Sequence, residues 1–548
     1  MIPIIPNCSL IWMVWKKTGN DRRRSHIFRV ALVRTFSYAD YKEPSEPMGI
    51  EALAAVLLKN GIEFRLFDRE TDSMDTVASQ IVEYGPSLLG LSVLMEGNAH
   101  DAAKILLKVR KKLDVPCVVG GLFVTTSYGN ARAIFPKDCM LVVGEGETAL
   151  LRICSGITGD LYPDMEKPHL APDQWPWLYR HNLQDYLDMD APISMKSSRG
   201  CPGQCRFCAT PSLPDGLNRW SGRKIADVAD EIEHLSKLYY PPAFCFVDDD
   251  FGPLSRLEAL VDELEKRNTR CALSLQLRAN TIYNTPDYER VMRKLKERGL
   301  YYIFIGIESF DEKTLEYFNK RLDPFKALKA AQTIRDCGIA VTVGYILWHP
   351  LSTVGSVRNE AIILRDAGFL TTKTCLSKLI MFKGCKLQKE PEIKYPDAVQ
   401  NYYNAAESAI APLYDAWFAG ALDLPKHHCL AYLEPGSSAL RNIAAIEKEL
   451  ERLDALAFNA LMDHAAVGDA ANAAAGEFYR AAAGEAANAA AGEFYRAAAG
   501  DAANTAAGEF YRAAAGDAAN AAAGEIVNAA AAAKGRFHEI SCAFVRSR

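Results

Sequence analysis

The chain has 548 residues, 49% of them hydrophobic, which is enough for two to four domains with large buried cores. Its formal net charge of −5, with both signs interspersed, argues against a nucleic acid as partner. The 14 cysteines are spread too thinly for a small disulfide-rich secreted protein, so we expect a reducing, cytoplasmic location with free thiols.

For residues 1–27 we predict an extension that precedes the first folded domain. The apolar stretch MIPIIPNCSLIWMVW is shorter than the roughly 20 residues of a membrane-spanning helix. Its basic residues follow the apolar stretch, which is the wrong order for a secretory signal. We expect a disordered extension or an early start codon, with a peripheral membrane contact as the less favoured alternative.

Residues 28–160 alternate short β-branched runs with helical segments, which predicts a doubly wound parallel sheet. The predicted strands lie in FRVALVR, IEFRLFD, PSLLGLSVL, VPCVVGG and CMLVVGEG. In such sheets ligands bind beyond the carboxyl ends of the strands, where glycines let the backbone approach them closely. Gly120, Gly121, Gly144 and Gly146 occupy these turns.

A connector rich in proline and tryptophan, residues 161–190, leads to a second series of alternating strands and helices. Its six predicted strands lie in PISMKSS, AFCFVDD, CALSLQL, YYIFIGI, IAVTVGYIL and TKTCLSKLI. Six such units predict a partial (β/α)6 barrel of parallel strands over residues 191–372. In barrels of this type the chemistry collects on loops at the carboxyl ends of the strands.

The loop RGCPGQCRFCAT, directly after the first of these strands, carries Cys201, Cys205 and Cys208. A disulfide is unexpected in a reducing compartment and would leave one thiol over. Structural zinc normally needs four ligands, and no second cluster of matching form follows. Three thiolates on an iron–sulfur cluster would leave one iron without a protein ligand, free to chelate a substrate.

The spacing of these cysteines, with the aromatic Phe207 just before the third, resembles the signature of radical S-adenosylmethionine enzymes. The resemblance implies that Cys201, Cys205 and Cys208 hold a catalytic [4Fe–4S] cluster, and that Phe207 lies near the bound S-adenosylmethionine. The predicted strand before the loop and the predicted barrel after it agree with this family.

The preceding domain has a resemblance of its own. The stretches EPMGIEALAAVLLKNGIEFRLFD, VVGG and VVGEGE are similar to the cobalamin-binding domain of cobalamin-dependent radical S-adenosylmethionine enzymes. An ordinary nucleotide-type α/β domain is the alternative. The resemblance implies cobalamin contacts at the glycine-rich turns, which comprise Gly120, Gly121, Gly144, Glu145 and Gly146.

The sequence lacks the Asp-x-His-x-x-Gly run that places an imidazole on cobalt, and His100 opens a predicted helix instead. If cobalamin binds, we therefore expect its lower face to be met near Leu94, Met95 and Glu96, without histidine ligation.

Polar residues at the other strand ends extend the resemblance to S-adenosylmethionine binding. Asp248 or Asp249 can accept hydrogen bonds from the methionine ammonium group. Arg278 can clamp the carboxylate, and Glu308 can accept hydrogen bonds from the ribose hydroxyls. The alternatives are ion pairs at the barrel mouth and, for Asp250, a helix cap.

Two further segments near the strand ends have no firm assignment. Trp348 and His349 follow the fifth predicted strand, where a substrate approaches, although a surface position is the simpler interpretation for His349. Arg219, Trp220 and Arg223 either enter a helix with solvated charges or cover the cofactors.

Residues 373–465 predict amphipathic helices that form a cap over the barrel mouth. Residues 466–533 repeat an Ala/Gly-rich unit with a sixteen-residue step, for which we expect a frayed, partly helical appendage, with a partner-binding arm as the alternative. The tail covers residues 534–548.

The family resemblance implies a [4Fe–4S] cluster, S-adenosylmethionine and cobalamin as cofactors. It implies a methyltransferase that acts on an unactivated carbon of a small molecule or natural-product precursor, after a 5′-deoxyadenosyl radical has removed hydrogen. An external donor such as a flavodoxin or ferredoxin would supply electrons. Radical rearrangement or cyclisation, polar methyl transfer, aminocarboxypropyl transfer and a non-enzymatic sensor remain alternatives.

Overall fold

The computed structural model describes residues 28–35, 45–162, 170–189, 191–214, 216–240, 242–389, 394–433 and 439–463. The predicted extension at 1–27, the repeats at 466–533 and the tail at 534–548 lie outside the described residues. Within the described ranges, no helix is both long enough and apolar enough to cross a membrane.

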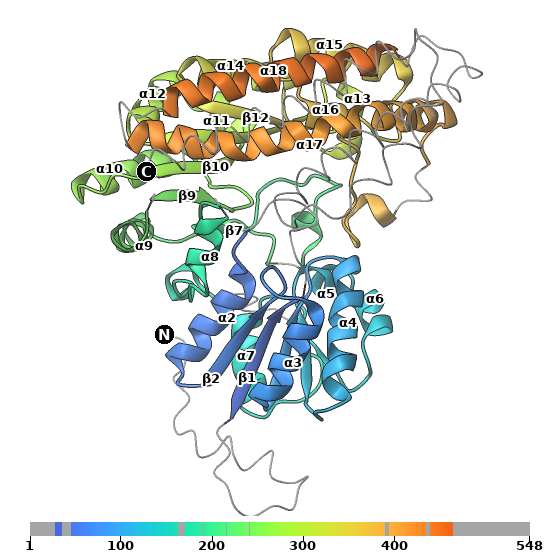
Figure 1. Ribbon diagram of the computed structural model, residues 1–548. Coiled ribbons are helices and arrows are strands. Elements are labelled where there is room, and N and C mark those ends of the chain that lie inside the picture. The colour runs from blue at the N-terminus through green and yellow to red at the C-terminus, as the bar shows by residue number, and fades with distance from the viewer. Residues whose placement is uncertain are drawn as a thin grey trace, which may run out of the picture. The chain divides into compact units, whose positions relative to one another are not determined.

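The first domain is a five-stranded parallel sheet with helices on both faces (Figure 1). The strand order is β2-β1-β3-β4-β5. The strands are β1 (Arg29–Arg34), β2 (Glu63–Asp68), β3 (Leu88–Ser92), β4 (Cys117–Gly120) and β5 (Met140–Leu141). The helices are α2 (Met48–Lys59), α3 (Met74–Tyr84), α4 (Glu96–Arg110), α5 (Leu122–Thr126), α6 (Tyr128–Ile134) and α7 (Gly146–Cys154). The predicted doubly wound sheet is confirmed.

The alternation of apolar residues along β1 explains why both faces of this sheet are covered. Val30 and Leu32 pack in the core beneath α2 and α7. Ala31 and Val33 point to the opposite face, into the core beneath α3, α4, α5 and α6. A strand buried on both faces reads as a continuous apolar run, which is typical of parallel sheets.

The connector contains the 3₁₀ helix η3 (Pro172–Gln174) and the short helix α8 (Leu183–Asp188). A second sheet follows with the order β12-β11-β10-β9-β6. Its strands are β6 (Ile193–Met195), β9 (Ala243–Phe246), β10 (Ala272–Arg278), β11 (Leu300–Glu308) and β12 (Ala340–Tyr345). The pairs β6–β9, β9–β10 and β11–β12 are parallel, as predicted.

Helices alternate with these strands, and a two-stranded antiparallel sheet flanks the cysteine loop. The small sheet consists of β7 (Ser198–Arg199) and β8 (Ser221–Gly222). The helices are η4 (Thr210–Ser212), α9 (Ile225–Leu238), α10 (Leu254–Lys266), α11 (Ala279–Tyr283), α12 (Tyr288–Glu297), α13 (Glu312–Phe318), α14 (Pro324–Asp336) and α15 (Val354–Asp366).

The segment predicted as the sixth strand differs from the prediction. Its first part forms the helical turn α16 (Thr372–Cys375). In the rest of the segment only Lys378 makes a strand-like contact, an isolated parallel β-bridge to Trp348. The Thr371 side chain accepts a hydrogen bond from the Thr374 backbone N–H and thereby caps the turn. Threonine favours strands by its branching but also caps helices, and here the capping role prevails.

By internal packing the chain divides into two compact units. The first comprises residues 1–276, 318–320 and 381–391, and the second comprises residues 277–317, 321–380 and 392–548. The boundary falls inside β10. The first unit therefore holds the whole first sheet, the cysteine loop and strands β6 and β9.

The C-terminal region of the second unit is helical, as predicted. After the 3₁₀ helix η5 (Leu387–Lys389) come α17 (Asp397–Leu433) and α18 (Ala439–Asp463), which pack side by side (Figure 1). Buried residues such as Ile410, Leu413, Ile446 and Leu453 supply the apolar stripes expected of amphipathic helices. Their proposed role as a cap over the barrel mouth stays a prediction.

Trp348 belongs to the core of the second unit. Its ring is fully buried, contacts Tyr402 and Tyr403 of α17, and donates its indole N–H to the Cys375 carbonyl at 2.8 Å. The next residue, His349, is 3% exposed, so the expected surface position is wrong. Burial lowers the pKa of His349 to about 4, which keeps the imidazole neutral near neutral pH.

Candidate functional site

The cysteine loop begins at a backbone turn that only glycine tolerates. Gly200 has φ +77°, and a Cβ atom there would lie 2.4 Å from the Arg219 carbonyl oxygen. On either side of it, Arg199 pairs with Ser221 in the small sheet and the Cys201 N–H donates to the Asn218 carbonyl at 3.3 Å. The first cysteine is therefore fixed against residues 218–222.

The remainder of the loop is anchored by its backbone. The Arg206 N–H donates to the Phe318 carbonyl at 2.8 Å, and the Asn319 side-chain amide donates to the Gln204 carbonyl at 2.8 Å. Phe207 packs edge-on against Phe318, with ring centroids 5.2 Å apart. These contacts hold the loop while the cysteine side chains take no part in them.

The three cysteines fit an iron–sulfur cluster by their chemistry and exposure. None of the three forms a disulfide and all three are only partly buried, so a cluster can reach them. The Gly203 N–H points at the Cys201 sulfur at 3.3 Å, a contact that stabilises a thiolate ligand. In the described part of the chain, no group of three His, Cys, Asp or Glu side chains converges as if on a single metal ion. Cluster thiolates need not converge, because each holds a different iron.

Asp248 and Asp249, at the end of β9, have different surroundings. Asp248 is buried and accepts hydrogen bonds from the Ser197 N–H (2.8 Å), the Ser197 hydroxyl (2.5 Å) and the Ser198 N–H (3.0 Å). Burial raises its pKa, and the hydrogen bonds from Ser197 and Ser198 work in the opposite direction. Asp248 therefore braces the segment that leads from β6 into the cysteine loop.

Asp249 is exposed and lies beside the cysteine loop. One of its carboxylate oxygens lies 3.4 Å from the Thr210 hydroxyl, and Thr210 in turn lies 3.7 Å from the Cys208 sulfur. Of the two candidates for the methionine ammonium group, Asp249 is thus the one whose carboxylate is accessible. The carboxylate of Asp250 accepts the Gly252 N–H at 3.4 Å within the turn, and the following helix has Pro253 at its cap position.

Residues 219–223 differ from the expected solvated entry to a helix. Arg219 is exposed, but Arg223 is buried and pairs with Asp227 at 2.7 Å and Glu231 at 2.6 Å. Trp220 donates its indole N–H to the Asp250 carbonyl at 2.8 Å. The prediction of solvated charges therefore fails for Arg223, because two carboxylates of α9 compensate its charge inside the protein.

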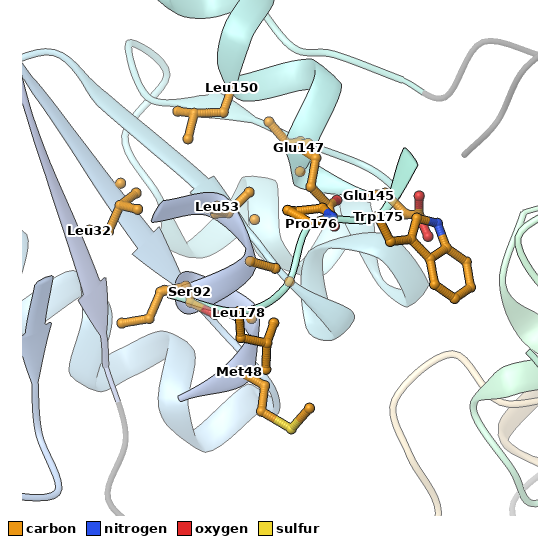
Figure 2. A pocket seen from close by; sticks show the side chains of 18 of the residues that line it. Leu32, Met48, Leu53, Ser92, Glu145, Glu147, Leu150, Trp175, Pro176 and Leu178 are labelled. Carbon is orange, nitrogen blue, oxygen red and sulfur yellow. The ribbon is translucent and has the colours of Figure 1, made fainter. Parts of the chain in front are cut away.

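A cavity of about 300 Å³ lies in the first unit, between the first sheet and its α2 and α7 face. Figure 2 shows Leu32, Leu53 and Leu150 on its apolar side and Glu145, Glu147 and Trp175 toward its other end. The residues that line it from the sheet and from the turns beyond its strands are Leu32, Gly90, Leu91, Ser92, Val118, Gly120, Gly121, Val142, Gly144, Glu145 and Gly146. Lys196, Arg199, Arg223 and Glu231 line it from the part of the chain around the cysteine loop.

Five predicted cobalamin contacts, Gly120, Gly121, Gly144, Glu145 and Gly146, line this cavity. The cavity fits part of cobalamin, because its walls are mostly apolar and the glycines at its strand ends leave the backbone open to a ligand. Its volume is too small for the whole of so large a cofactor. Among the described residues that line it there is no histidine.

Met95 and Glu96 are not among the residues that line the cavity. Glu96 pairs instead with Lys383 at 3.2 Å, and Met95 precedes the first turn of α4. His100 is exposed on the same helix. The structure therefore does not bring the residues expected at the lower face of the cofactor to the cavity that holds the glycine-rich turns.

Arg199 connects the cysteine loop with the glycine-rich turn. Its guanidinium pairs with Glu145 at 2.5 Å and Glu147 at 2.7 Å, and lies 4.5 Å from the centre of the Trp175 ring. Burial alone would favour neutral groups, but Arg199 holds the pKa of Glu147 below its usual value. Likewise both carboxylates, Glu147 foremost, raise the pKa of Arg199 despite its burial.

Arg278 and Glu308, the other predicted contacts of S-adenosylmethionine, belong to the second unit. They are the last residues of the neighbouring strands β10 and β11. Glu308 has φ +76°, a strained conformation for a residue other than glycine, and the register shifts between Gly306 and Glu308. Such strain is common at functional sites, and the contacts of both residues with S-adenosylmethionine stay predictions.

Sequence reasoning missed Lys196, Arg199 and Trp175 as lining residues. A signal was present, because Arg199 directly precedes the glycine and first cysteine, while the turn GEGE offers two carboxylates. Trp175 is a large aromatic residue in a connector, a position where such a side chain needs a buried partner.

Comparison with protein families identifies both domains. The model of the B12 binding domain matches residues 37–153, and the model of the radical SAM superfamily matches residues 195–352. The chain therefore combines a B12-binding domain with a radical SAM domain. Its cofactors are the [4Fe–4S] cluster, S-adenosylmethionine and cobalamin, as predicted.

Two curated relatives of this radical SAM protein carry names that refer to methyl transfer. It is 26% identical over 332 residues to an uncharacterized methyltransferase of Pyrococcus horikoshii, covering 56% of this chain and 70% of the relative. It is 23% identical over 331 residues to the hopanoid C-3 methylase of Methylococcus capsulatus, covering 55% and 61% of the two chains.

Among solved structures, the cobalamin-dependent S-adenosylmethionine radical enzyme OxsB, with aqua-cobalamin and S-adenosylmethionine bound, has a similar fold. The TM-score is 0.62 with 14% sequence identity, and the match covers 82% of this chain and 76% of OxsB. At that identity the comparison supports the fold of this radical SAM protein, while its substrate must be argued from the site.

Proposed function

We propose that this protein is a cobalamin-dependent radical SAM methyltransferase that methylates an unactivated carbon of a small molecule or natural-product precursor. The observation that carries the proposal is that Arg199, two residues before Cys201, also lines the cavity beside the glycine-rich turn. The cluster loop and the cobalamin cavity are thus neighbours within one compact unit. The names of the two relatives support methyl as the transferred group.

When bound, the cluster would supply the electron that cleaves S-adenosylmethionine to a radical, and cobalamin would supply the methyl group. The residues of this chain bind the cofactors, orient the cysteine loop and exclude water. Cys201, Cys205 and Cys208 would hold the cluster, and Asp249 would accept the methionine ammonium group. Asp248 orients the loop through Ser197 and Ser198, since it accepts three hydrogen bonds from them.

The apolar wall of the cavity would exclude water from one part of cobalamin. Leu32, Val118 and Leu150 line it, and all three are buried. Dry surroundings strengthen every electrostatic contact at the rim, including those of Glu145 and Glu147 with Arg199. Positioning and exclusion of this kind are what a protein contributes when its cofactors carry the chemistry.

The proposed reaction also needs an electron donor and a substrate. Reduction of the cluster requires an external donor, for which we propose a flavodoxin or ferredoxin. The described cysteines form no disulfides, which agrees with a reducing, cytoplasmic compartment. A small-molecule substrate agrees with the relatives, and nucleic acid remains an unexpected partner at a net charge of −5.

The test is anaerobic reconstitution of the full chain with iron, sulfide and hydroxocobalamin, followed by incubation with a low-potential chemical reductant and S-adenosylmethionine deuterated at its methyl group. We expect the loaded protein to form 5′-deoxyadenosine and S-adenosylhomocysteine, and candidate substrates to gain a deuterated methyl group. If 5′-deoxyadenosine forms without S-adenosylhomocysteine, rearrangement or cyclisation replaces methyl transfer. If methylthioadenosine accumulates, an aminocarboxypropyl group is transferred. A loaded protein that consumes no S-adenosylmethionine would refute the enzymatic assignment.

A further inference from the structure

We propose that Arg199 is a positioning residue that couples cobalamin occupancy of the cavity to the geometry of the cysteine loop. The inference rests on the proposed function only in that cobalamin occupies the cavity. It concerns the clasp formed by Arg199, Glu145, Glu147 and Trp175, which no sequence motif defines.

The clasp is a buried, charged contact with little freedom. The side chains of Arg199, Glu145 and Glu147 are 18%, 19% and 7% exposed. Two carboxylates and the Trp175 ring take up three sides of one planar guanidinium, an arrangement that lysine cannot reproduce. Removing one partner of a buried ion pair leaves the other charge uncompensated, so separating Arg199 from either glutamate is costly.

At one end, the clasp forms part of the cavity. Glu145, Glu147, Trp175 and Arg199 all line it, and Figure 2 shows the first three together at one end. Gly144, in the left-handed region at φ +94°, sets the turn from which both glutamates project. A ligand that fills the cavity therefore touches the atoms that hold Arg199.

At its other end, the clasp is tied to the first cluster cysteine. Arg199 lies in β7, and a single residue, Gly200, separates it from Cys201. Gly200 lies so close to the Arg219 carbonyl that a Cβ would clash at 2.4 Å, and the Cys201 N–H is bonded to Asn218. The backbone between Arg199 and Cys201 is short and tightly packed, so we expect a displacement of Arg199 to displace Cys201 as well.

Two sites that share a rigid element influence each other reciprocally. If cobalamin favours one position of the clasp, then a loop ordered by the cluster must favour cobalamin by the same factor. Couplings of this kind are typically fivefold or larger, which a binding titration resolves.

The experiment uses the full chain in two states, with and without the reconstituted cluster, titrated anaerobically with hydroxocobalamin. Binding is followed by the visible absorbance of the corrin, and hydrogen exchange is measured by mass spectrometry. In the wild type we expect about fivefold or tighter binding of hydroxocobalamin with the cluster present. Exchange should slow both in peptides of the cavity, residues 140–150, and in peptides of the loop, residues 199–208.

Arg199→Met removes the guanidinium and Arg199→Lys keeps only its charge. In both variants we expect hydroxocobalamin still to slow exchange at residues 140–150, but no longer at residues 199–208. The ratio of the hydroxocobalamin affinities measured with and without the cluster should fall to about one. Glu147→Gln, which keeps the size of its side chain, should lower the ratio if Arg199→Met does not fold. Arg152→Met is the matched control, because Arg152 is exposed on the last turn of α7.

The proposal is overturned if Arg199→Lys and Glu147→Gln retain the wild-type ratio and the response of the loop, or if Arg152→Met loses as much. It also fails if wild-type protein binds hydroxocobalamin while residues 199–208 do not respond. Because the readouts are affinity and exchange, absence of methyl transfer would refute the proposed function without affecting this result. A wild-type chain that binds no hydroxocobalamin would refute both.

Discussion

The two parallel sheets build their sites in opposite ways. In the first sheet the site is a cavity, shaped by glycine backbone and by apolar side chains such as Leu32 and Val118. Around the second sheet the site consists of the thiols of Cys201, Cys205 and Cys208, on a loop whose backbone is anchored by hydrogen bonds. Adding atoms should therefore damage the first site, whereas removing atoms should damage the second.

The largest effect is expected from Cys205→Ala. Loss of one of three thiolate ligands should prevent stable assembly of the cluster and abolish formation of 5′-deoxyadenosine, while hydroxocobalamin still binds in the cavity. Iron and sulfide analysis and the visible spectrum of the anaerobic protein measure both. Cys337→Ala, at the end of α14, is the control and should retain the cluster. A Cys205→Ala protein with the full iron content would contradict the assignment of this loop.

Gly120→Phe tests the cavity by adding atoms. Gly120 lines the cavity at the end of β4, and we expect a phenyl ring there to weaken hydroxocobalamin binding by about 10- to 100-fold while leaving the cluster intact. Gly120→Ala is the matched control, because a Cβ would meet Val142 at an ordinary 3.7 Å. Equal affinities of the two variants in a titration would show that cobalamin binds elsewhere.

Substitutions of the neighbouring residues Asp248 and Asp249 should have different effects, one on the stability of the protein and the other on the binding of S-adenosylmethionine. Asp249→Asn is expected to raise the KM for S-adenosylmethionine by about tenfold with unchanged thermal stability, since Asp249 is exposed. Asp248→Asn is expected to lower the free energy of unfolding by about 1–3 kcal/mol, because an amide would face the donors of Ser197 and Ser198. Steady-state kinetics measures the first effect and chemical denaturation the second. If Asp248→Asn raised the KM and Asp249→Asn lowered the stability, Asp248 would be the residue that binds S-adenosylmethionine.

Glu51 gives the first domain a pH dependence that an apolar core would not have. It is fully buried on α2, and burial, assisted by Glu46, raises its pKa to about 8. Between the usual value of 4.5 and about 8, the folded chain holds a proton that the unfolded chain has released. The free energy of unfolding therefore falls as the pH rises, by at most about 1.4 kcal/mol per pH unit.

Glu51→Gln should remove this contribution. Relative to the wild type, the variant is expected to gain stability between about pH 5 and about pH 8, as measured by chemical denaturation. Glu63→Gln, on the edge strand β2 with its side chain 41% exposed, is the control and should leave the pH dependence unchanged. If the free energy of unfolding depends on pH in the same way in the wild type and in Glu51→Gln, Glu51 does not carry the proton.

Most of the secondary structure followed from apolar periodicity and local caps. In the strand FRVALVR the four consecutive residues Val30, Ala31, Leu32 and Val33 are apolar and buried. Helix α3 begins at the Ser73 cap and ends at Gly85 in the left-handed conformation, and both are local signals. The error at α16 arose because threonine serves strands and caps alike, and neighbouring residues do not decide between them. Trp348 and His349 were misjudged because only the packing of α17 shows that the end of β12 is covered.

The amino-acid sequence by itself determined the chemistry of this protein, because a cysteine spacing and glycine-rich turns are local and their meaning does not depend on distant residues. Only the tertiary structure decided which of Asp248 and Asp249 is accessible, where the charge of Arg223 is compensated and what Arg199 contacts. Glu147 and Arg199 are 52 positions apart, and an ion pair over that separation leaves no periodic trace in the chain. Burial and long-range pairing are properties of the folded chain, and they set the accessibility and the protonation of the groups that the sequence had named.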